Sequence, residues 1–114
     1  MDLDFKERFK DSYTKIKLLG EQYAEAKGQS WQMQELLSSV RSKIMLSLGE
    51  MAISRAEITA KSSPDYTKYV EETAEAIKKE LKLKAQYEAE KARFEAYRSL
   101  SSLEKRTRTL IDGD

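Results

Sequence analysis

The segment Ser62-Ser63-Pro64-Asp65 contains the single proline of this 114-residue chain. Proline fits the first turn of a helix but disrupts a helix interior, so one helix is expected to end here and another to begin. Ser63 is a candidate N-cap, and Asp65 lies where the positive end of a helix dipole favours an acidic residue. The segment therefore predicts a tight turn over residues 62–65 between two long helices.

Helical periodicity extends from this turn in both directions. After the turn, apolar residues recur at three- and four-residue steps from Tyr66 to Ala96, with Glu88 as the one polar residue in the series. Before the turn they do so from Met33 to Met51. The steps follow an eleven-residue repeat, which is typical of straight or slightly right-handed helix pairing. No segment has the two-residue alternation of a β-strand.

Three helices are expected, over about residues 2–27, 31–61 and 64–111, within a single domain. Gly28 and Ser30 leave two alternatives for the boundary between the first two. Either the chain breaks and Ser30 caps a new helix, or one continuous helix bends at this point.

The composition is that of a long-helix or coiled-coil protein. Charged residues make up 36% of the chain and apolar residues 39%, with only four glycines. The net charge of +1 gives no overall attraction to nucleic acid or membrane, so any such attraction must come from local patches. No apolar run is long enough to span a bilayer, and no membrane partner is expected. The absence of cysteine fits a reducing, cytoplasmic setting.

A two-helix hairpin has one seam and cannot surround its own apolar side chains. The apolar stripes here are wider than one seam, so other copies of the chain are expected to cover them. We predict an all-α fold, a long antiparallel helical hairpin with a short N-terminal helix, which assembles into a homo-oligomeric helical ring or bundle. The residues predicted to line the core or the contacts between copies are Trp31, Leu37, Val40, Ile44, Leu48, Met51, Ile77, Leu81, Phe94 and Tyr97. Trp31 fits either a packed core or an anchor in a partner's pocket.

The region after the turn is polarised in charge. Residues 64–75 contain one lysine against four carboxylates, a net charge of −3, whereas residues 76–108 contain ten basic and five acidic residues, a net charge of +5. An acidic start and a basic end suit the helix dipole, and this accounts for part of the pattern without any function.

Basic residues recur every seven residues late in the chain and form one helical stripe: Lys84, Lys91, Arg98 and Lys105. Tyr87, Phe94 and Tyr97 lie three or four residues from these charges, on the adjoining face. Cations that bind phosphates, beside aromatic rings that stack on bases, are typical of single-strand nucleic-acid binding. The alternative is that the rings belong to the core and that the long basic side chains lie along its edge.

A second, sparser basic group precedes the turn and consists of Arg41, Lys43, Arg55 and Lys61, against Glu50 and Glu57. It is either an ordinary solvated helix face or a nucleic-acid contact. In a ring of identical chains, a few such charges per subunit would repeat into a continuous track.

The sequence favours binding over catalysis. Without histidine or cysteine, the usual transition-metal ligand sets and nucleophile pairs cannot be built. The four glycines are isolated, so there is no glycine-rich phosphate loop. We expect neither enzymatic activity nor a cofactor.

The order of these features resembles the UvsY-type recombination mediators of phages. The resemblance covers about residues 20–111 and is carried by the basic helix before the turn, the Ser62–Tyr66 turn and the stretch Gln86-Tyr87-Glu88-Ala89-Glu90-Lys91-Ala92-Arg93-Phe94-Glu95-Ala96-Tyr97-Arg98. It implies a ring-forming protein that binds single-stranded DNA and helps to load a RecA-like recombinase onto strands covered by single-strand-binding protein. It also implies DNA contacts near Arg55 and Lys61.

The sequence therefore predicts an oligomeric single-stranded-DNA-binding accessory protein of phage homologous recombination, in the cytoplasm of the infected host. The alternative is a non-enzymatic structural or adaptor hairpin, such as a scaffold or a coiled-coil partner, with no nucleic-acid role.

Overall fold

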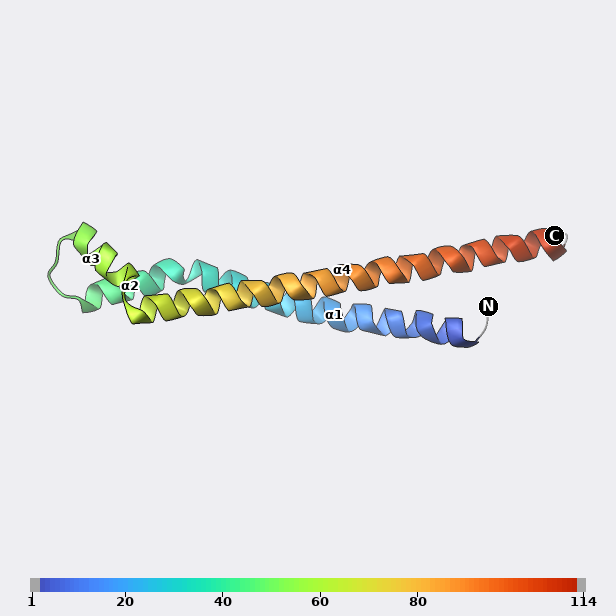
Figure 1. Ribbon diagram of the computed structural model, residues 1–114, viewed down its shortest axis with the longest axis horizontal. Helices are drawn as coiled ribbons and strands as arrows, with labels where there is room; N and C mark the ends of the chain where they lie inside the picture. Colours follow the sequence, from blue (N-terminus) through green and yellow to red (C-terminus); the bar gives the residue numbers. More distant parts are fainter. Residues whose placement is uncertain (1–2, 113–114) are drawn as a thin grey trace. The chain divides into compact units, whose positions relative to one another are not determined.

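The structure is a computed structural model that describes residues 3–112 (Figure 1). Its four helices are α1 (Leu3–Glu35), α2 (Leu37–Ser47), α3 (Ile53–Lys61) and α4 (Pro64–Asp112). No strand occurs within this range, and the predicted all-α class is confirmed.

The turn before α4 forms as its sequence indicates. The Tyr66 backbone N–H donates to the Ser63 hydroxyl over 3.2 Å, which is the expected N-cap bond. The same hydroxyl donates to the Ala60 carbonyl oxygen over 2.7 Å, so one side chain joins the end of α3 to the start of α4. Pro64 is the first residue of α4, where its missing N–H leaves no helical bond unmade.

The chain runs through Gly28 and Ser30 as one continuous helix, α1. Ser30 is fully buried, and its hydroxyl accepts a hydrogen bond from the Gln34 side-chain amide over 3.0 Å instead of capping a helix. Of the two alternatives for this region, the structure therefore has the unbroken helix.

The prediction of one helix over residues 31–61 is wrong. The end of α1, then α2 and α3 share this range, and a loop over residues 48–52 separates α2 from α3. Gly49 ends α2 with a φ of +76°, a left-handed conformation that only glycine adopts without strain. The Gly49 N–H bonds back to the Leu46 carbonyl over 3.4 Å, as expected at a helix end. Apolar residues keep their helical spacing through this loop, so the periodicity of the sequence did not predict it.

The junction between α1 and α2 is a smaller irregularity. Leu36 keeps right-handed helical angles, its N–H bonds to the Gln32 carbonyl, and its own carbonyl accepts from the Val40 N–H, both over 3.0 Å. Backbone hydrogen bonding is thus helical on both sides of this residue.

The contacts divide the chain into two compact units, and the single domain expected from the sequence stays a prediction. We call Met1–Tyr23 with Lys82–Asp114 the terminal unit, and Ala24–Leu81 the central unit. The division follows from helix geometry, because a residue on a long helix can contact only the segment that lies beside it. Each unit has its own packing.

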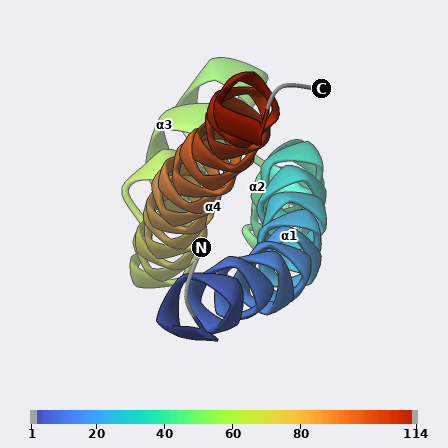
Figure 2. The ribbon, with the colours of Figure 1, turned by 90° about the vertical axis from the view of Figure 1, so that its right-hand side faces the viewer.

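In the terminal unit, the first part of α1 and the last part of α4 run antiparallel (Figure 2). Four pairs of aromatic rings join the two segments, with centroids 4.8–6.1 Å apart: Phe5–Tyr97, Phe9–Phe94, Tyr13–Phe94 and Tyr23–Tyr87. Residue numbers rise along α1 as they fall along α4, which defines the antiparallel direction. One buried hydrogen bond, from the Ser12 hydroxyl to the Glu90 carboxylate over 2.9 Å, lies among these rings.

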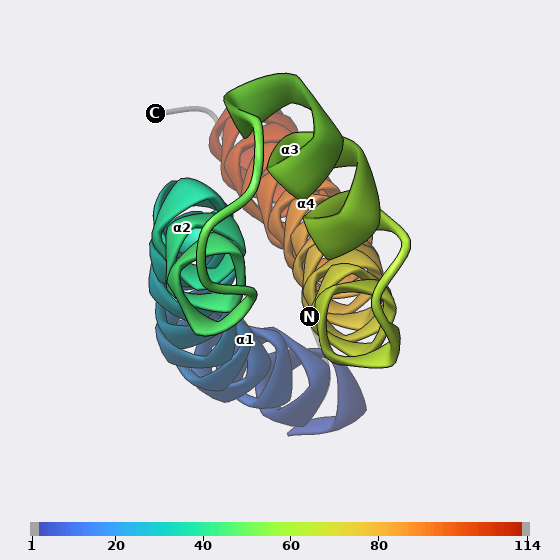
Figure 3. The same ribbon diagram turned by 90° about the vertical axis from the view of Figure 1, so that its left-hand side faces the viewer.

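The central unit is packed through small residues. Its buried residues are Ala26, Ser30, Ala56, Ala60 and Thr73. The Tyr69 hydroxyl donates to the Met33 backbone carbonyl over 3.0 Å and so ties α4 to α1 within this unit. Figure 3 shows α2 and α3 with the loop that connects them, and these two helices contact each other. Small side chains let the backbones approach closely but bury little apolar area.

Candidate nucleic-acid and assembly surfaces

The predicted basic stripe lies on one helix and is open to solvent. Lys84, Lys91, Arg98 and Lys105 are all exposed residues of α4. Steps of seven residues place them on nearly the same helix face, about 10 Å apart along the axis. The four cations thus form one exposed row on α4, and their contact with nucleic acid stays a prediction.

Two of these cations have partners. The Arg98 guanidinium lies 3.3 Å from the Glu95 carboxylate, with both side chains more than half exposed. The Lys91 ammonium lies 5.0 Å from the centroid of the Tyr87 ring. An exposed ion pair and a single cation–π contact are weak, so a phosphate oxygen can compete for either cation.

The aromatic residues beside the stripe belong to the packing of the terminal unit. Tyr87, Phe94 and Tyr97 are half-buried and pair with rings of α1. These rings therefore pack in the seam between α1 and α4, which favours the alternative to base stacking. What remains for nucleic acid on this face is the row of charges.

The second basic group is divided between α2 and α3. Arg41 is half-buried and pairs with Glu57 over 3.7 Å, and its Nε atom is buried without a hydrogen-bond partner. Lys43 on α2, and Arg55 and Lys61 on α3, are exposed. Because the loop over residues 48–52 separates the two helices, these residues do not form the single helical face that the sequence indicated. Arg41 instead helps to pair α2 with α3.

The predicted core and interface residues fall into two sets. Seven of them are half-buried: Leu37, Val40, Ile44, Leu48, Ile77, Phe94 and Tyr97. Three are exposed, namely Trp31 at 64%, Leu81 at 55% and Met51 at 37%. The alternative that places Trp31 in a packed core is therefore wrong within this chain. The three exposed residues are available for contacts between chains.

The end of α4 carries an apolar surface that the sequence analysis did not single out. Leu100, Leu103 and Ile111 are more than half exposed, and with Thr107 and with Phe5 of α1 they line an open groove of about 550 Å³. The steps of three, four and four residues along this part of α4 are the signal that could have revealed it. This apolar stripe is inconspicuous in the sequence because Glu104, Lys105, Arg106 and Arg108 lie between its members.

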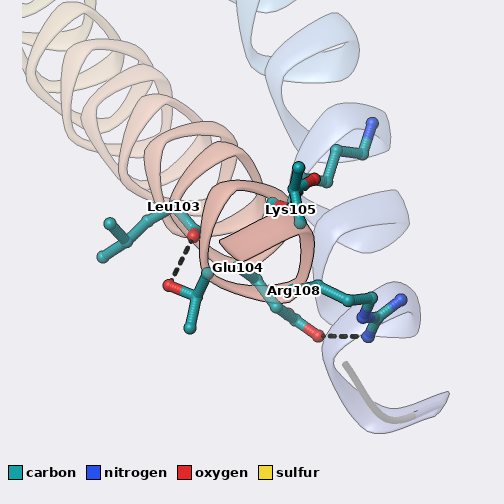
Figure 4. Close-up of polar contacts among 6 residues, drawn as sticks. Leu103, Glu104, Lys105 and Arg108 are labelled. Carbon is teal, nitrogen blue, oxygen red and sulfur yellow. Dashed lines mark hydrogen bonds and ion pairs between the residues drawn. The ribbon is translucent and has the colours of Figure 1, made fainter. Parts of the chain in front are cut away.

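A small hollow of about 260 Å³ adjoins this groove and is basic. Lys6 of α1 and Lys105 and Arg108 of α4 line it, together with Ser101 and Glu104. Figure 4 shows Lys105 and Arg108 extending from the same side of α4, and the Arg108 guanidinium meeting the Glu104 carboxylate over 3.0 Å. Three cations thus face one carboxylate.

The start of α4 carries the opposite charge. Glu71, Glu72 and Glu75 line a shallow groove of about 750 Å³ with Lys68 and Lys79, and Gln29 and Met33 of α1 complete it. Three carboxylates face two ammonium groups here, a net charge of −1, because Lys79 adds a positive charge from beyond residues 64–75 and Asp65 does not line the groove.

Residues 3–112 contain no cluster of three or more acidic side chains arranged to hold a metal ion. None of the helices in this range is long and apolar enough to cross a membrane. Comparison of the chain with protein-family models, with curated proteins and with solved structures finds no match.

Proposed function

We propose that this chain is a non-enzymatic, self-associating protein that binds single-stranded DNA along α4 and acts as an accessory protein of recombination. The observation that carries the proposal is the row of four exposed cations, Lys84 to Lys105, on one face of one continuous helix. Phosphate contacts of this kind supply most of the affinity in sequence-independent binding.

The packing of the aromatic rings determines the mode of binding that we propose. With Tyr87, Phe94 and Tyr97 engaged in the terminal unit, the strand is held by its phosphates and not by its bases. Binding should therefore depend steeply on salt and little on base sequence. One stripe is a weak site, and several copies bound to the same strand would raise the affinity through multivalency.

Self-association is supported by the exposure of large apolar side chains in both units. They include Leu46, Ile53, Leu110 and Ile111, which are 78–83% exposed. Among residues 4–111, the buried apolar residues are three alanines, Ala26, Ala56 and Ala60. A surface with this much apolar area gains free energy when a second chain covers it.

The role in recombination rests on the resemblance to UvsY-type mediators. In that role, assembled copies would hold a strand by its phosphates in competition with single-strand-binding protein. A RecA-like recombinase would then load on the strand, in the cytoplasm of the infected host.

The DNA-binding part is tested with Lys84→Gln/Lys91→Gln. Anisotropy of a labelled oligo-dT is titrated over a series of salt concentrations. Loss of two phosphate contacts should lower the slope of log affinity against log salt by about 1.4. The matched control is Lys10→Gln/Lys17→Gln, which removes two exposed lysines of α1 at the same spacing and should leave the slope unchanged.

A second candidate is a structural or adaptor protein without a nucleic-acid role. It is favoured by the same ring packing, which withdraws the aromatic residues from the basic face, and by the ion pair of Arg98 with Glu95. If the wild-type chain assembles but the oligo-dT anisotropy stays flat at low salt, this second function replaces the first.

A further inference from the structure

The end of α4 combines an apolar groove with basic edges. Leu103 and Ile111 lie in the groove at 59% and 78% exposure. Arg106 lies three residues after Leu103, and Arg108 lies three residues before Ile111, so each cation borders the apolar stripe on the helix surface. This arrangement fits a helix that has an apolar face and acidic flanks.

The chain itself supplies such a helix at the start of α4. Val70 is 39% exposed, and Ala74, one helical turn further on, is also exposed. Glu71 and Glu75 each follow one of these two residues directly, so both carboxylates lie along one side of the apolar pair.

We propose that the acidic start of α4 in one copy binds the basic-edged groove at the end of α4 in another copy. This inference rests on the proposed self-association and identifies the two surfaces that make it. Their charges are complementary, with a net of −3 over residues 64–75, whereas the hollow that adjoins the groove is lined by Lys6, Lys105 and Arg108 with Glu104 as its one carboxylate.

The two surfaces differ, and the contact is therefore heterologous. Each copy offers one groove and one acidic helix start, so copies add head to tail. Such a series closes into a ring when its rotation allows closure and otherwise extends as a filament. A like-with-like contact of groove on groove would instead stop at a dimer, and it would place Arg108 of each copy near the same cations of the other.

Charge exchange between two variants tests the proposal. The groove variant is Lys6→Glu/Arg108→Glu, and the acid variant is Glu71→Lys/Glu75→Lys. Each variant alone brings like charges together at the contact, so its light-scattering mass at micromolar concentration and low salt should fall to that of the 13.2 kDa monomer. An equal mixture restores opposite charges at every contact between unlike variants and should raise the mass well above that of the monomer.

The matched control is Lys10→Glu/Lys17→Glu, which reverses two exposed charges on α1 outside both surfaces and should leave the mass unchanged. Circular dichroism at 222 nm checks that all variants stay helical. Wild-type mass in both variants overturns the proposal and leaves the groove to an acidic helix of another protein. Wild-type mass in the acid variant alone overturns it in favour of a like-with-like contact of two grooves, and wild-type mass in the groove variant alone also overturns it. Two monomeric variants whose mixture stays monomeric overturn it as well, because opposite charges at the contact then fail to restore association.

This result is separable from the DNA-binding proposal. Lys84 and Lys91 line neither the groove nor the acidic surface, and sizing is carried out without DNA. A wild-type chain that is monomeric at micromolar concentration overturns self-association as a whole, whereas an unchanged salt slope in Lys84→Gln/Lys91→Gln affects DNA binding alone.

Discussion

The terminal and central units differ in the size of the residues at the contact between their helices. The terminal unit places large rings between two helices. Most of these rings are half-buried and Tyr13 is exposed, because this unit has no third helix to cover them. The central unit buries alanine, serine and threonine and leaves large side chains such as Leu46 and Ile53 exposed. Two packed helices without further layers can place large residues at their contact, where these stay partly exposed, as in the terminal unit. They can also place small residues at the contact and leave the large residues on the solvent side, as in the central unit.

Both solutions leave apolar area in contact with water. A small residue permits close approach but gains little from burial, and a half-buried ring gains only part of its transfer free energy. The comparison indicates that neither unit is stabilised by a core of its own. We therefore expect the free energy of unfolding to fall when a large residue between the helices is truncated in the terminal unit and when a small one is enlarged in the central unit. Stability is best compared at one protein concentration, since association contributes to it.

Phe94→Ala should have the largest effect. Phe94 contacts Phe9 at 4.8 Å and Tyr13 at 6.1 Å between ring centroids. A fully buried phenylalanine loses 3–5 kcal/mol on truncation, so a half-buried one should lose about 2 to 3 kcal/mol of unfolding free energy. Urea denaturation measures the loss. Hydrogen exchange should show lower protection in the terminal unit than in the central unit, and an equal loss in both would contradict their separate packing.

Ala60→Leu tests the central unit. Ala60 has no exposed surface, so the three added carbon atoms have no space and should destabilise the protein by about 2 kcal/mol. The same urea denaturation measures it. The matched control is Ala52→Leu, at an exposed alanine just before α3, which should change the free energy by less than about 0.5 kcal/mol. If Ala60→Leu left the free energy of unfolding unchanged, the helices around Ala60 would have to be packed loosely enough to accept the larger side chain.

Ser12→Ala should have a smaller effect, in the terminal unit. It removes the hydroxyl that donates to Glu90, a carboxylate that is only 8% exposed. The loss should be about 1 to 2 kcal/mol, because a buried charged group is left with one partner fewer. Ser12→Thr keeps the hydroxyl and serves as the rescue variant. A Ser12→Ala protein as stable as the wild type would show that Arg93, 3.6 Å from the same carboxylate, is partner enough.

The smallest change in stability is expected from glycine-to-alanine substitutions, which we compare at one glycine in each unit. At Gly28, in the central unit, an added Cβ meets nothing within 4 Å, so Gly28→Ala should stabilise the protein by about 0.5 to 1 kcal/mol. At Gly20, in the terminal unit, the same atom lies 3.2 Å from the Tyr87 ring, and displacement of the ring should cancel that gain. Thermal denaturation compares the two. Equal gains would mean that the Tyr87 ring moves freely.

The sequence located the features that depend on local chemistry. Pro64 and Ser63 act through their own backbone and side chain, so the turn and its N-cap could be predicted, and the observed range of α4 differs from the prediction by one residue at its end. The helical class followed from periodicity alone. The four cations of the stripe share a face because they lie on one helix.

Features that depend on distant residues could not be predicted. The apolar rhythm across Gly49 matches a continuous helix, and only the left-handed angle of this one residue ends α2. The ring partners of Phe94 lie on α1, far away in the sequence, so sequence periodicity could not decide between stacking on bases and packing in the seam. Arg41 pairs with Glu57 only because the loop over residues 48–52 turns the chain.

The hydrogen bond between Ser12 and Glu90 has a consequence for how the two segments of the terminal unit align. Rings along a seam tolerate sliding, since a ring displaced by one helical turn meets another ring or an aliphatic side chain. The Glu90 carboxylate does not, because a shift of one turn would take away its hydroxyl donor and leave a buried charge poorly paired. A single polar pair of this kind fixes coiled-coil register in other proteins, and here it selects one alignment from several that the rings alone would accept.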